Sequence, residues 1–283
     1  FEADYLKIHP LRAPSVQAYV TIQTGCNKFC TYCVVPYARG LERNRPVKDI
    51  LAECTALVER GVQEITLLGQ TVNSFRASDP EAFSQNNPYK DHFAALLWEV
   101  QQLSGLVRLH WTAAHPLSMT DEVIDALALP KQVNYLHLPV QSGNNEVLRR
   151  MNRKYTREQY LEVIRKIRVR VPNLALGTDI IVGFPGETRA AFEETLSLYR
   201  EVDFDISYNA QYSPRSGTLA MKLFPDDIPA QEKRERWDEI QALMEETSLR
   251  KNKAYEGKEL RMLVERVEQG IARLVAAVGL PAE

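Results

Sequence analysis

The stretch Gly25-Cys26-Asn27-Lys28-Phe29-Cys30-Thr31-Tyr32-Cys33 holds three of the chain's four cysteines, spaced Cys-x-x-x-Cys-x-x-Cys. Thiolates this close together bind iron or zinc, and the number of ligands indicates which metal is held. A structural zinc site is closed by four ligands, whereas the nearest histidines in the sequence are the distant His9 and His92. A 4Fe–4S cluster held by three thiolates keeps one iron open for a substrate or cofactor. The spacing therefore favours a catalytic cluster.

Three simpler interpretations stay open on spacing alone. In the first, Cys30 and Cys33 form a redox pair. In the second, the three cysteines bind zinc together with a distant fourth ligand. In the third, the thiols are buried and have no function. The fourth cysteine has its own prediction. Cys54 recurs with Ile50 and Leu57 at helical spacing, so we expect it on the buried face of a helix rather than as a ligand.

Size and composition limit the classes of protein to consider. With 283 residues, 45% of them hydrophobic, the chain can bury the core of one α/β barrel plus a fragment. A net charge of −2 gives no bulk argument for nucleic acid or membrane, although a local basic patch would be enough for a nucleic acid. No apolar run approaches the ~18 residues of a membrane span, and no secretory signal opens the chain. Closely spaced thiols predict a cytoplasmic protein, and Phe1 in place of methionine predicts a fragment.

Strand-like and helical stretches alternate along the chain, which is typical of a parallel sheet with right-handed crossovers. Six strands fall short of the eight in a full barrel, and the chemistry of such folds lies at the C-terminal ends of the strands. The predicted strands are residues 18–23, 64–68, 107–112, 135–140, 176–182 and 206–211, the last continuing as a polar segment to Thr218. The predicted helices begin at Pro46 and cover about 92–104, 120–128, 156–170, 188–201 and 229–254.

Other stretches complete the prediction. Residues 1–15 resemble an incoming linker, because Pro10 and Pro14 discourage regular structure. Residues 76–91 are polar with two prolines and predict a surface loop, and residues 260–267 alternate like a strand. The long last helix is expected to bury Trp237, Ile240, Leu243 and Met244.

Polar residues gather at the predicted strand ends. Taken alone, each has an ordinary interpretation as a turn, a cap or a surface charge. A phosphate-binding loop is excluded at 183–188, because the Gly-Lys-Ser/Thr ending is missing. Histidines near strands are more often hydrogen-bonded core residues than bases, so none receives a role. These residues are Gly69, Gln70, Gln141, Ser142, Arg153 and Asp179, with the histidines His110, His115 and His137.

The cysteine spacing resembles that of the radical S-adenosylmethionine (SAM) superfamily. The resemblance implies an α/β fold, an open six-stranded (β/α)6 partial TIM barrel, with a 4Fe–4S cluster on Cys26, Cys30 and Cys33. The methionine amine and carboxylate of SAM would occupy the open iron. An electron from the cluster would then split the sulfonium to give a 5′-deoxyadenosyl radical. No catalytic side chain is assigned beyond the cluster.

The same resemblance implies contacts to SAM at the strand ends. Gly69 and Gln70 match the segment that meets the SAM amine, and Gln141 with Ser142 matches a segment that reaches SAM. A planar guanidinium suits a carboxylate in a dry site. The remaining matches are Arg153, twelve residues after Gln141, for the SAM carboxylate, Tyr32 for the adenine and Asp179 for the ribose.

Within the superfamily, the chain is similar to tRNA methylthiotransferases that act on isopentenyl-adenosine beside the anticodon. The likeness covers residues 16–265 and rests on the cysteine run, Gly69-Gln70-Thr71-Val72-Asn73, His115-Pro116 and Leu138-Pro139-Val140-Gln141-Ser142-Gly143. Relatives acting on a ribosomal-protein aspartate are the alternative, against which Asn73 argues, and relatives acting on threonylcarbamoyl-adenosine are another. The resemblance implies tRNA and its anticodon stem-loop as partner, flavodoxin or ferredoxin as reductant, no membrane, and a monomer.

Two departures from this family shape the expected domains. The family has an N-terminal domain whose three further cysteines hold an auxiliary 4Fe–4S cluster, and only Cys54 remains here. It also ends in a small RNA-binding β-barrel, called TRAM, of which residues 260 onward resemble the first strand. We therefore expect a linker at 1–15, a radical SAM domain at 16–254 and a truncated TRAM-like start at 255–283. Such a fragment would cleave SAM without inserting sulfur. A non-catalytic zinc-binding module is the alternative from a different class.

Overall fold

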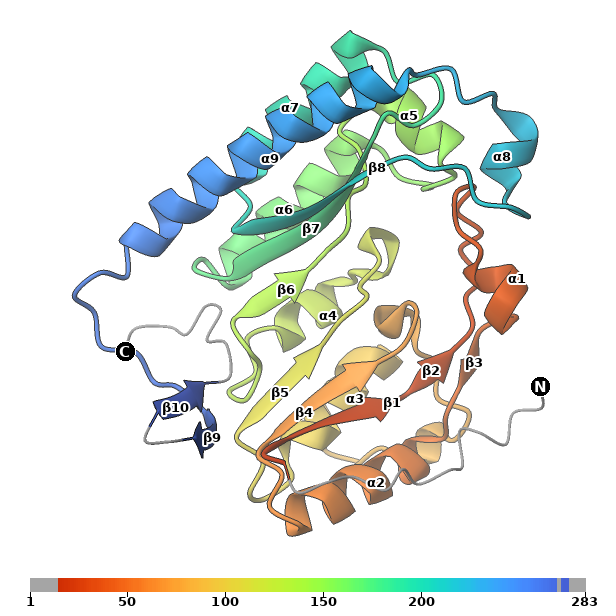
Figure 1. Ribbon diagram of the computed structural model, residues 1–283. Coiled ribbons are helices and arrows are strands. Elements are labelled where there is room, and N and C mark those ends of the chain that lie inside the picture. Colours follow the sequence, from red (N-terminus) through yellow and green to blue (C-terminus); the bar gives the residue numbers. More distant parts are fainter. Residues whose placement is uncertain (1–14, 269–270, 275–283) are drawn as a thin grey trace.

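Six parallel strands form the centre of the computed structural model, which describes residues 15–268 and 271–274. Hydrogen bonds join them in chain order into two three-stranded sheets, β1-β4-β5 and β6-β7-β8, and a parallel bridge from Leu109 to Gln132 lies between the sheets. Figure 1 shows the strands as one curved series that leaves a gap between β1 and β8. Their bounds are β1 Gln17–Thr21, β4 Glu64–Leu68, β5 Arg108–Trp111, β6 Tyr135–His137, β7 Ala175–Val182 and β8 Ile206–Gln211. The predicted α/β class with a parallel sheet is confirmed.

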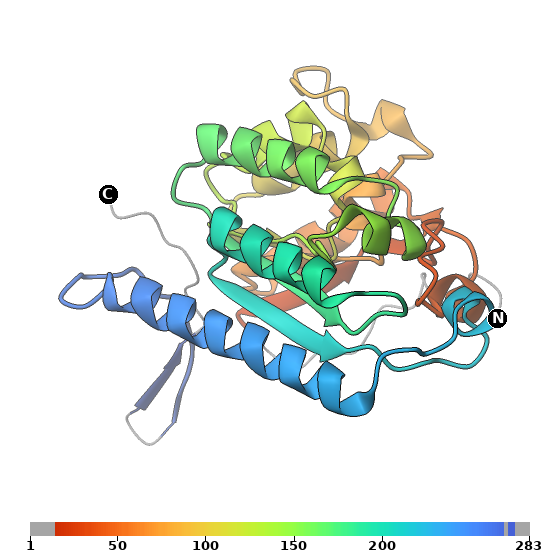
Figure 2. The ribbon, with the colours of Figure 1, turned by 90° about the horizontal axis from the view of Figure 1, so that it is seen from above.

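Helices cover the outer side of this series (Figure 2). Polar caps start several of them, since Thr120, Asn144, Thr156 and Thr188 each accept a backbone N–H of the first turn. The long helices are α2 Val47–Glu59, α3 His92–Gln101, α6 Arg157–Arg170, α7 Arg189–Val202 and α9 Ala230–Lys253. The shorter ones are α1 Val35–Arg39, α4 Asp121–Ala126, α5 Asn145–Arg150 and α8 Leu219–Leu223, with 3₁₀ turns η2 Val72–Ser74, η3 Pro80–Ala82 and η4 Pro116–Ser118.

The larger of two apolar clusters in the described residues fills the space between strands and helices. On β4 the side chains of Ile65 and Leu67 are fully buried in it, and alternate residues such as Thr66 point to the other face. The core extends from Ala18 on β1 to Ile240 on α9. Cys54 is also fully buried in it, so the prediction of a core cysteine is confirmed. Trp237, Leu243 and Met244 pack against the same core, as the predicted inner face of α9 required.

Several predicted boundaries are wrong for local reasons. The first strand is interrupted, because after β1 the chain forms a separate two-residue strand, β2 Gln23–Thr24, that pairs antiparallel with β3 Arg43–Asn44. Pro46 is the N-cap of α2 rather than its first helical residue. The strand predicted to Val140 ends at His137, and the polar continuation of the sixth strand ends at Gln211. The loop at 76–91 contains η3, and its Phe83 and Tyr89 pack on the core.

The C-terminal strand starts later than predicted. The observed strands are β9 Val264–Glu268 and β10 Ile271–Leu274, which form an antiparallel hairpin, whereas the predicted strand began at residue 260. The predicted linker at 1–15 lies outside the described residues except for Ser15, as does much of the predicted domain at 255–283. Among the described helices, none has the length and apolarity needed to cross a membrane.

Candidate functional site

The three spaced cysteines lie in a loop between β2 and α1, residues 25–34, which we call the cysteine loop. The β2–β3 pair closes the segment that contains this loop and α1, and beside the pair Cys26 N–H donates to Gly40 O over 3.2 Å. Gly25 starts the loop with φ of +70°, and a Cβ there would lie 2.1 Å from Leu41 O. Only glycine fits this close approach of two backbones. The hairpin thus fixes where the loop leaves the sheet.

Each thiol of the cysteine loop lies beside donor groups of the same protein. Cys26 Sγ is 3.6 Å from Thr71 Oγ1 and accepts from Lys28 N–H at 3.5 Å. Val35 N–H donates to Cys33 Sγ at 3.5 Å, at the start of α1. Burial raises the pKa of the Cys33 thiol, and the nearby thiols of Cys30 and Cys26 act in the same direction. Negative charge on one thiol thus opposes charge on the next, which a bound cation would relieve.

The donor set fits an iron–sulfur cluster better than a single metal ion. Within residues 15–268 and 271–274, no three His, Cys, Asp or Glu side chains are arranged to hold one metal ion. The open zinc interpretation needs such a convergence. A 4Fe–4S cluster places each cysteine on a different iron, so its ligands surround the cluster instead of meeting at one point. The thiols of Cys30 and Cys26 are near enough to raise the pKa of Cys33, as neighbouring ligands of one cluster would be.

Arg153, in the segment between α5 and α6, contacts the cysteine loop. Its Nη1 donates to Cys30 Sγ at 3.3 Å and to Tyr32 Oη at 3.4 Å, and its Nη2 donates to Pro139 O at 3.1 Å. Its Nε donates to Tyr155 Oη at 2.9 Å. The side chain is buried, and none of these partners is a carboxylate. A buried guanidinium with no acidic partner is ready to bind an anion.

Of the other predicted SAM contacts, Tyr32 accepts from Arg153, and Gln141 stands two residues after Pro139, whose carbonyl also accepts from Arg153. Burial raises the pKa of the Tyr32 phenol well above its usual value, so the phenol stays protonated beside Cys30 and Arg153. Gln141 is buried with φ of +74°, and its backbone is bonded on both sides to β7, through Asp179 O and Ile181 N–H. A left-handed glutamine is unusual and typical of functional sites. Its role as a SAM contact stays a prediction.

The remaining predicted contacts follow β4, lie within β7 or precede α5, and Arg153 donates to none of them. Gly69 and Gln70 follow β4 and are half-buried. Asp179 on β7 pairs with His137 Nε2 at 3.0 Å, and it is 41% exposed, so one side is open to a ligand. Ser142 is fully buried, and its hydroxyl lies 3.3 Å from Thr195 Oγ1 and accepts from Asn144 N–H. Ser142 therefore has hydrogen-bond partners at the start of α5, and its role as a SAM contact stays a prediction.

Tyr155 and Thr71 belong to the site but were not predicted. Tyr155 Oη accepts from Arg153 and donates to Val140 O at 2.9 Å, which holds the guanidinium against the segment that follows β6. Thr71 is the closest hydroxyl to Cys26 and also donates its N–H to the Gln23 side chain. Both stand within two residues of predicted contacts, Arg153 and Gln70. Proximity to those residues was the available signal.

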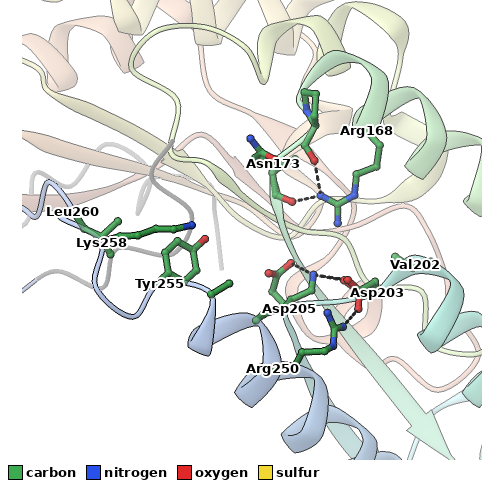
Figure 3. Close-up of a pocket in the computed structure, with 13 residues that line it drawn as sticks. Arg168, Asn173, Val202, Asp203, Asp205, Arg250, Tyr255, Lys258 and Leu260 are labelled. Carbon is green, nitrogen blue, oxygen red and sulfur yellow. Dashed lines mark hydrogen bonds and ion pairs between the residues drawn. The ribbon is translucent and has the colours of Figure 1, made fainter. Parts of the chain in front are cut away.

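The pocket drawn in Figure 3 lies at the other end of the strands and does not belong to this site. It has a volume of about 530 Å³ and is lined by residues that precede β7 and β8 and by the end of α9. Arg250 and Lys251 of α9 pair there with Asp203, and Arg168 donates to the carbonyls of Pro172 and Leu174. The charged groups of this pocket thus bond α9 to the N-terminal ends of the strands.

Comparison with known proteins agrees with this geometry. The chain is 49% identical over 256 residues to the tRNA-2-methylthio-N(6)-dimethylallyladenosine synthase of Clostridium botulinum strain Hall, covering 90% of this chain and 55% of the relative. It is 46% identical over 266 residues to the enzyme of the same name from Geobacillus thermodenitrificans, covering 93% and 49%. The chain thus spans about half the length of the curated relatives it matches.

Solved structures with a similar fold include two at low sequence identity. The radical S-adenosylmethionine methyltransferase TsrM of Kitasatospora setae aligns with a TM-score of 0.58 at 18% identity, over 72% of this chain and 38% of that one. Coproporphyrinogen III oxidase (HemN) of Escherichia coli aligns with a TM-score of 0.56 at 20% identity, over 81% and 52%. The model of the Radical SAM superfamily matches residues 20–199. The chain therefore belongs to the radical SAM superfamily.

Proposed function

We propose that the parent of this chain is a tRNA methylthiotransferase that adds a methylthio group to isopentenyl-adenosine beside the anticodon. The observation that carries the proposal is the cysteine loop with a buried, carboxylate-free Arg153 against Cys30. The identity to relatives named for 2-methylthio-dimethylallyladenosine synthesis supports the substrate class. Membership of the superfamily makes a 4Fe–4S cluster and SAM the cofactors of this domain.

The residues of the site have distinct tasks in this proposal. Cys26, Cys30 and Cys33 hold the cluster, which when bound supplies the electron for reductive cleavage of SAM. Arg153 contributes a fixed positive charge and a planar fork that pairs with the SAM carboxylate. Tyr155 orients that fork by accepting from Nε, so the guanidinium keeps one direction. The burial of these groups excludes water and strengthens each charged contact.

The rest of SAM would bind near the C-terminal ends of the strands. Gln70, just after β4, and Gln141, beyond the end of β6, supply amides. The partly exposed carboxylate of Asp179 accepts from a ribose hydroxyl. His137 holds Asp179 from the inner side at 3.0 Å and so orients that carboxylate. Tyr32, within the cysteine loop, accepts from Arg153 Nη1 at 3.4 Å, and its aromatic face suits the adenine.

The proposal extends to the parent's partners and domains. The parent would bind the tRNA anticodon stem-loop as a monomer in the cytoplasm and accept electrons from a flavodoxin or ferredoxin. Residues 16–254 would be its radical SAM domain, and the β9–β10 hairpin would belong to the start of a TRAM-like barrel at 255–283. An auxiliary cluster would be held by an N-terminal domain joined through residues 1–15. This chain has only Cys54 besides the cysteine loop, and Cys54 is buried in the core.

The test is anaerobic reconstitution of this chain with iron and sulfide, followed by assay with SAM and a strong reductant. We expect close to four irons and four sulfides per chain and release of 5′-deoxyadenosine. Mass spectrometry of tRNA digests should show no methylthio product with this chain and clear product with the full-length parent. The matched control is Cys30→Ala against Cys54→Ala, of which only the first should lose iron and cleavage. Zinc in place of iron, or cleavage unchanged in Cys30→Ala, would refute the proposal.

A further inference from the structure

A strained junction joins the cysteine loop to the turn that follows α5, residues 151–156, which we call the α5–α6 turn. Phe29 in the loop and both Asn152 and Lys154 in the turn have left-handed backbones, with φ of 49°, 59° and 61°. Such conformations cost about 1–3 kcal/mol each for residues other than glycine and persist only where the surroundings hold them. Half of the six left-handed non-glycine residues in the described part of the chain therefore gather at one junction.

Three hydrogen bonds connect the cysteine loop with the last residue of α5 and with the α5–α6 turn, apart from the two that Arg153 donates to the loop. Thr31 N–H donates to Met151 O at 3.1 Å, and Thr31 Oγ1 donates to Arg150 O at 2.8 Å. Asn152 Nδ2 donates to Phe29 O at 2.9 Å. The bonded residues are 119 to 123 positions apart along the chain, so the junction closes a long loop.

Asn152 has an ordinary structural role as well. It occupies the first position beyond the C-cap Met151, where its N–H donates to Arg149 O at 3.0 Å and Arg153 N–H donates to Leu148 O at 2.9 Å. These two bonds make a Schellman motif, whose left-handed position is usually glycine and only sometimes asparagine. Glycine would adopt this backbone with less strain. The cap alone therefore does not account for an asparagine.

We propose that Asn152 is a positioning residue that holds the cysteine loop in its metal-binding conformation before any metal arrives. Its amide bonds the carbonyl of Phe29, the left-handed residue immediately before Cys30. A loop carrying this strain would relax when released, moving Cys30 away from its place beside Arg153. The proposal rests on the proposed function only in taking the three thiols as cluster ligands.

Three variants at position 152 separate the effect of the Asn152 side-chain hydrogen bond from the effect of the helix cap. Asn152→Gly keeps the left-handed backbone and removes the amide, Asn152→Ala removes the amide and strains the backbone, and Asn152→Asp puts a carboxylate against the Phe29 carbonyl. We expect Asn152→Gly to unfold at the same or a higher temperature than the unmodified chain. In the metal-free protein, amide hydrogen exchange within residues 26–34 should nonetheless become about fivefold faster, since one hydrogen bond contributes about 1 kcal/mol.

The same variants should also change how fast the cluster-loaded protein loses iron. Iron loss to a chelator should be about fivefold faster in Asn152→Gly, and faster still in Asn152→Asp. Lys154→Gly is the matched control, because it relieves a left-handed residue of the same turn that makes no described contact with the loop. It should leave loop exchange and iron loss unchanged.

Two outcomes would overturn the proposal. Loop exchange that is unchanged in Asn152→Gly, or changed equally in Lys154→Gly, would leave Asn152 with a capping role only. The exchange experiment uses metal-free protein, so it decides the role of Asn152 even if the unmodified chain fails to bind iron. That failure would count against the proposed function instead.

Discussion

Arg153 is the side chain on which most of the site converges. It reaches the Cys30 thiol, the Tyr32 and Tyr155 hydroxyls and the Pro139 carbonyl, and it lies over the Tyr155 ring at 5.2 Å. Desolvation opposes the charge, yet the surrounding phenols and thiol hold the pKa of Arg153 well above its usual value. The guanidinium thus stays positive in a dry place. Its four hydrogen-bond partners fix the orientation of the guanidinium plane. The flexible ammonium of a lysine would not be held in one orientation in this way.

Replacing Arg153 by lysine should weaken SAM binding by about 10- to 100-fold, because the charge remains but the planar fork is lost. Iron content should stay close to that of the unmodified chain, since Cys30 remains. Calorimetric titration of the anaerobic, cluster-loaded protein with SAM would measure the change. Arg149→Lys is the control, since Arg149 is exposed on α5 and pairs only with Glu146. Equal SAM affinity in Arg153→Lys would remove this residue from the binding site.

His115 should make stability depend on pH. Burial, followed by the nearby charges of Arg153 and Lys28, lowers the pKa of His115 to about 2, and burial lowers that of His110 to about 4. Below pH ~6.5 the unfolded chain binds protons that the folded chain refuses. The free energy of unfolding should therefore fall by about 1.4 kcal/mol per pH unit for each histidine as the pH drops.

The variant His115→Asn tests this sign, because its amide oxygen can still accept from Leu117 N–H as the ring nitrogen does. Urea unfolding between pH 7 and 4 should show a shallower decline than in the unmodified chain. His110→Gln should reduce the decline only between pH ~6.5 and pH ~4, because below pH ~4 the His110 ring of the unmodified chain becomes charged in the fold as well. Parallel curves for His115→Asn and the unmodified chain would contradict the assignment.

Among the secondary-structure elements, α9 is bonded to the start of α7 by a buried ion pair. Arg236 Nη1 donates to the Glu187 carboxylate at 2.8 Å and to its backbone carbonyl at 2.7 Å, with both side chains fully buried. Glu187 in turn accepts from Gly183 N–H at 2.6 Å, just after β7. The pair therefore connects the last helix to the end of a strand that borders the site.

Removing one member of this pair should be costly, because the other remains charged or unpaired in the core. We expect Arg236→Met to lower the free energy of unfolding by about 3–5 kcal/mol, and Arg236→Met combined with Glu187→Leu to recover much of the loss. Arg234→Met is the control on the same helix, with an exposed pair to Asp238, and should change stability by less than about 0.5 kcal/mol. Urea unfolding would measure all three. A double variant no better than Arg236→Met would contradict this account.

At the scale of the whole molecule, the fold does not depend on the cysteine loop. The apolar core joins β1 to α9 without Cys26, Cys30 or Cys33. The parallel ladders also lie outside the loop. The loop's Tyr32 packs only against the smaller apolar cluster, which contains Val147 and Phe184. Most of the framework of strands and helices is therefore formed without the loop.

Removal of the cluster should consequently leave the chain folded. After anaerobic chelation we expect an unchanged far-ultraviolet circular dichroism spectrum and a thermal midpoint lowered only by the lost binding energy. Restoring iron and sulfide should return the midpoint. The Cys54→Ala chain is a useful comparison, because it should lose stability with or without iron through a cavity in the core. Loss of helix content on chelation would show that the cluster is part of the fold.

Much of the architecture was predictable because it depends on local patterns. The strands at β4 and β8 have the predicted bounds, and the long helices begin within a few residues of the predicted positions, since apolar periodicity and polar caps lie within each segment. The interruption between β1 and β2 was not predictable in this way. It depends on the pairing of Gln23 with Asn44, a contact between two segments that the apolar periodicity of either segment does not predict.

The three thiols, their spacing and the alternation of strands and helices can be recognised in the sequence, because each of these depends on neighbours along the chain. The contacts of Arg153 with Cys30 across 123 positions, of Ser142 with Thr195 and of Asn152 with Phe29 appear only in the folded molecule. Those contacts depend on which strands lie side by side and on the left-handed turns at 29, 152 and 154. The geometry that unites distant residues arises from the packing of elements, which no single segment encodes.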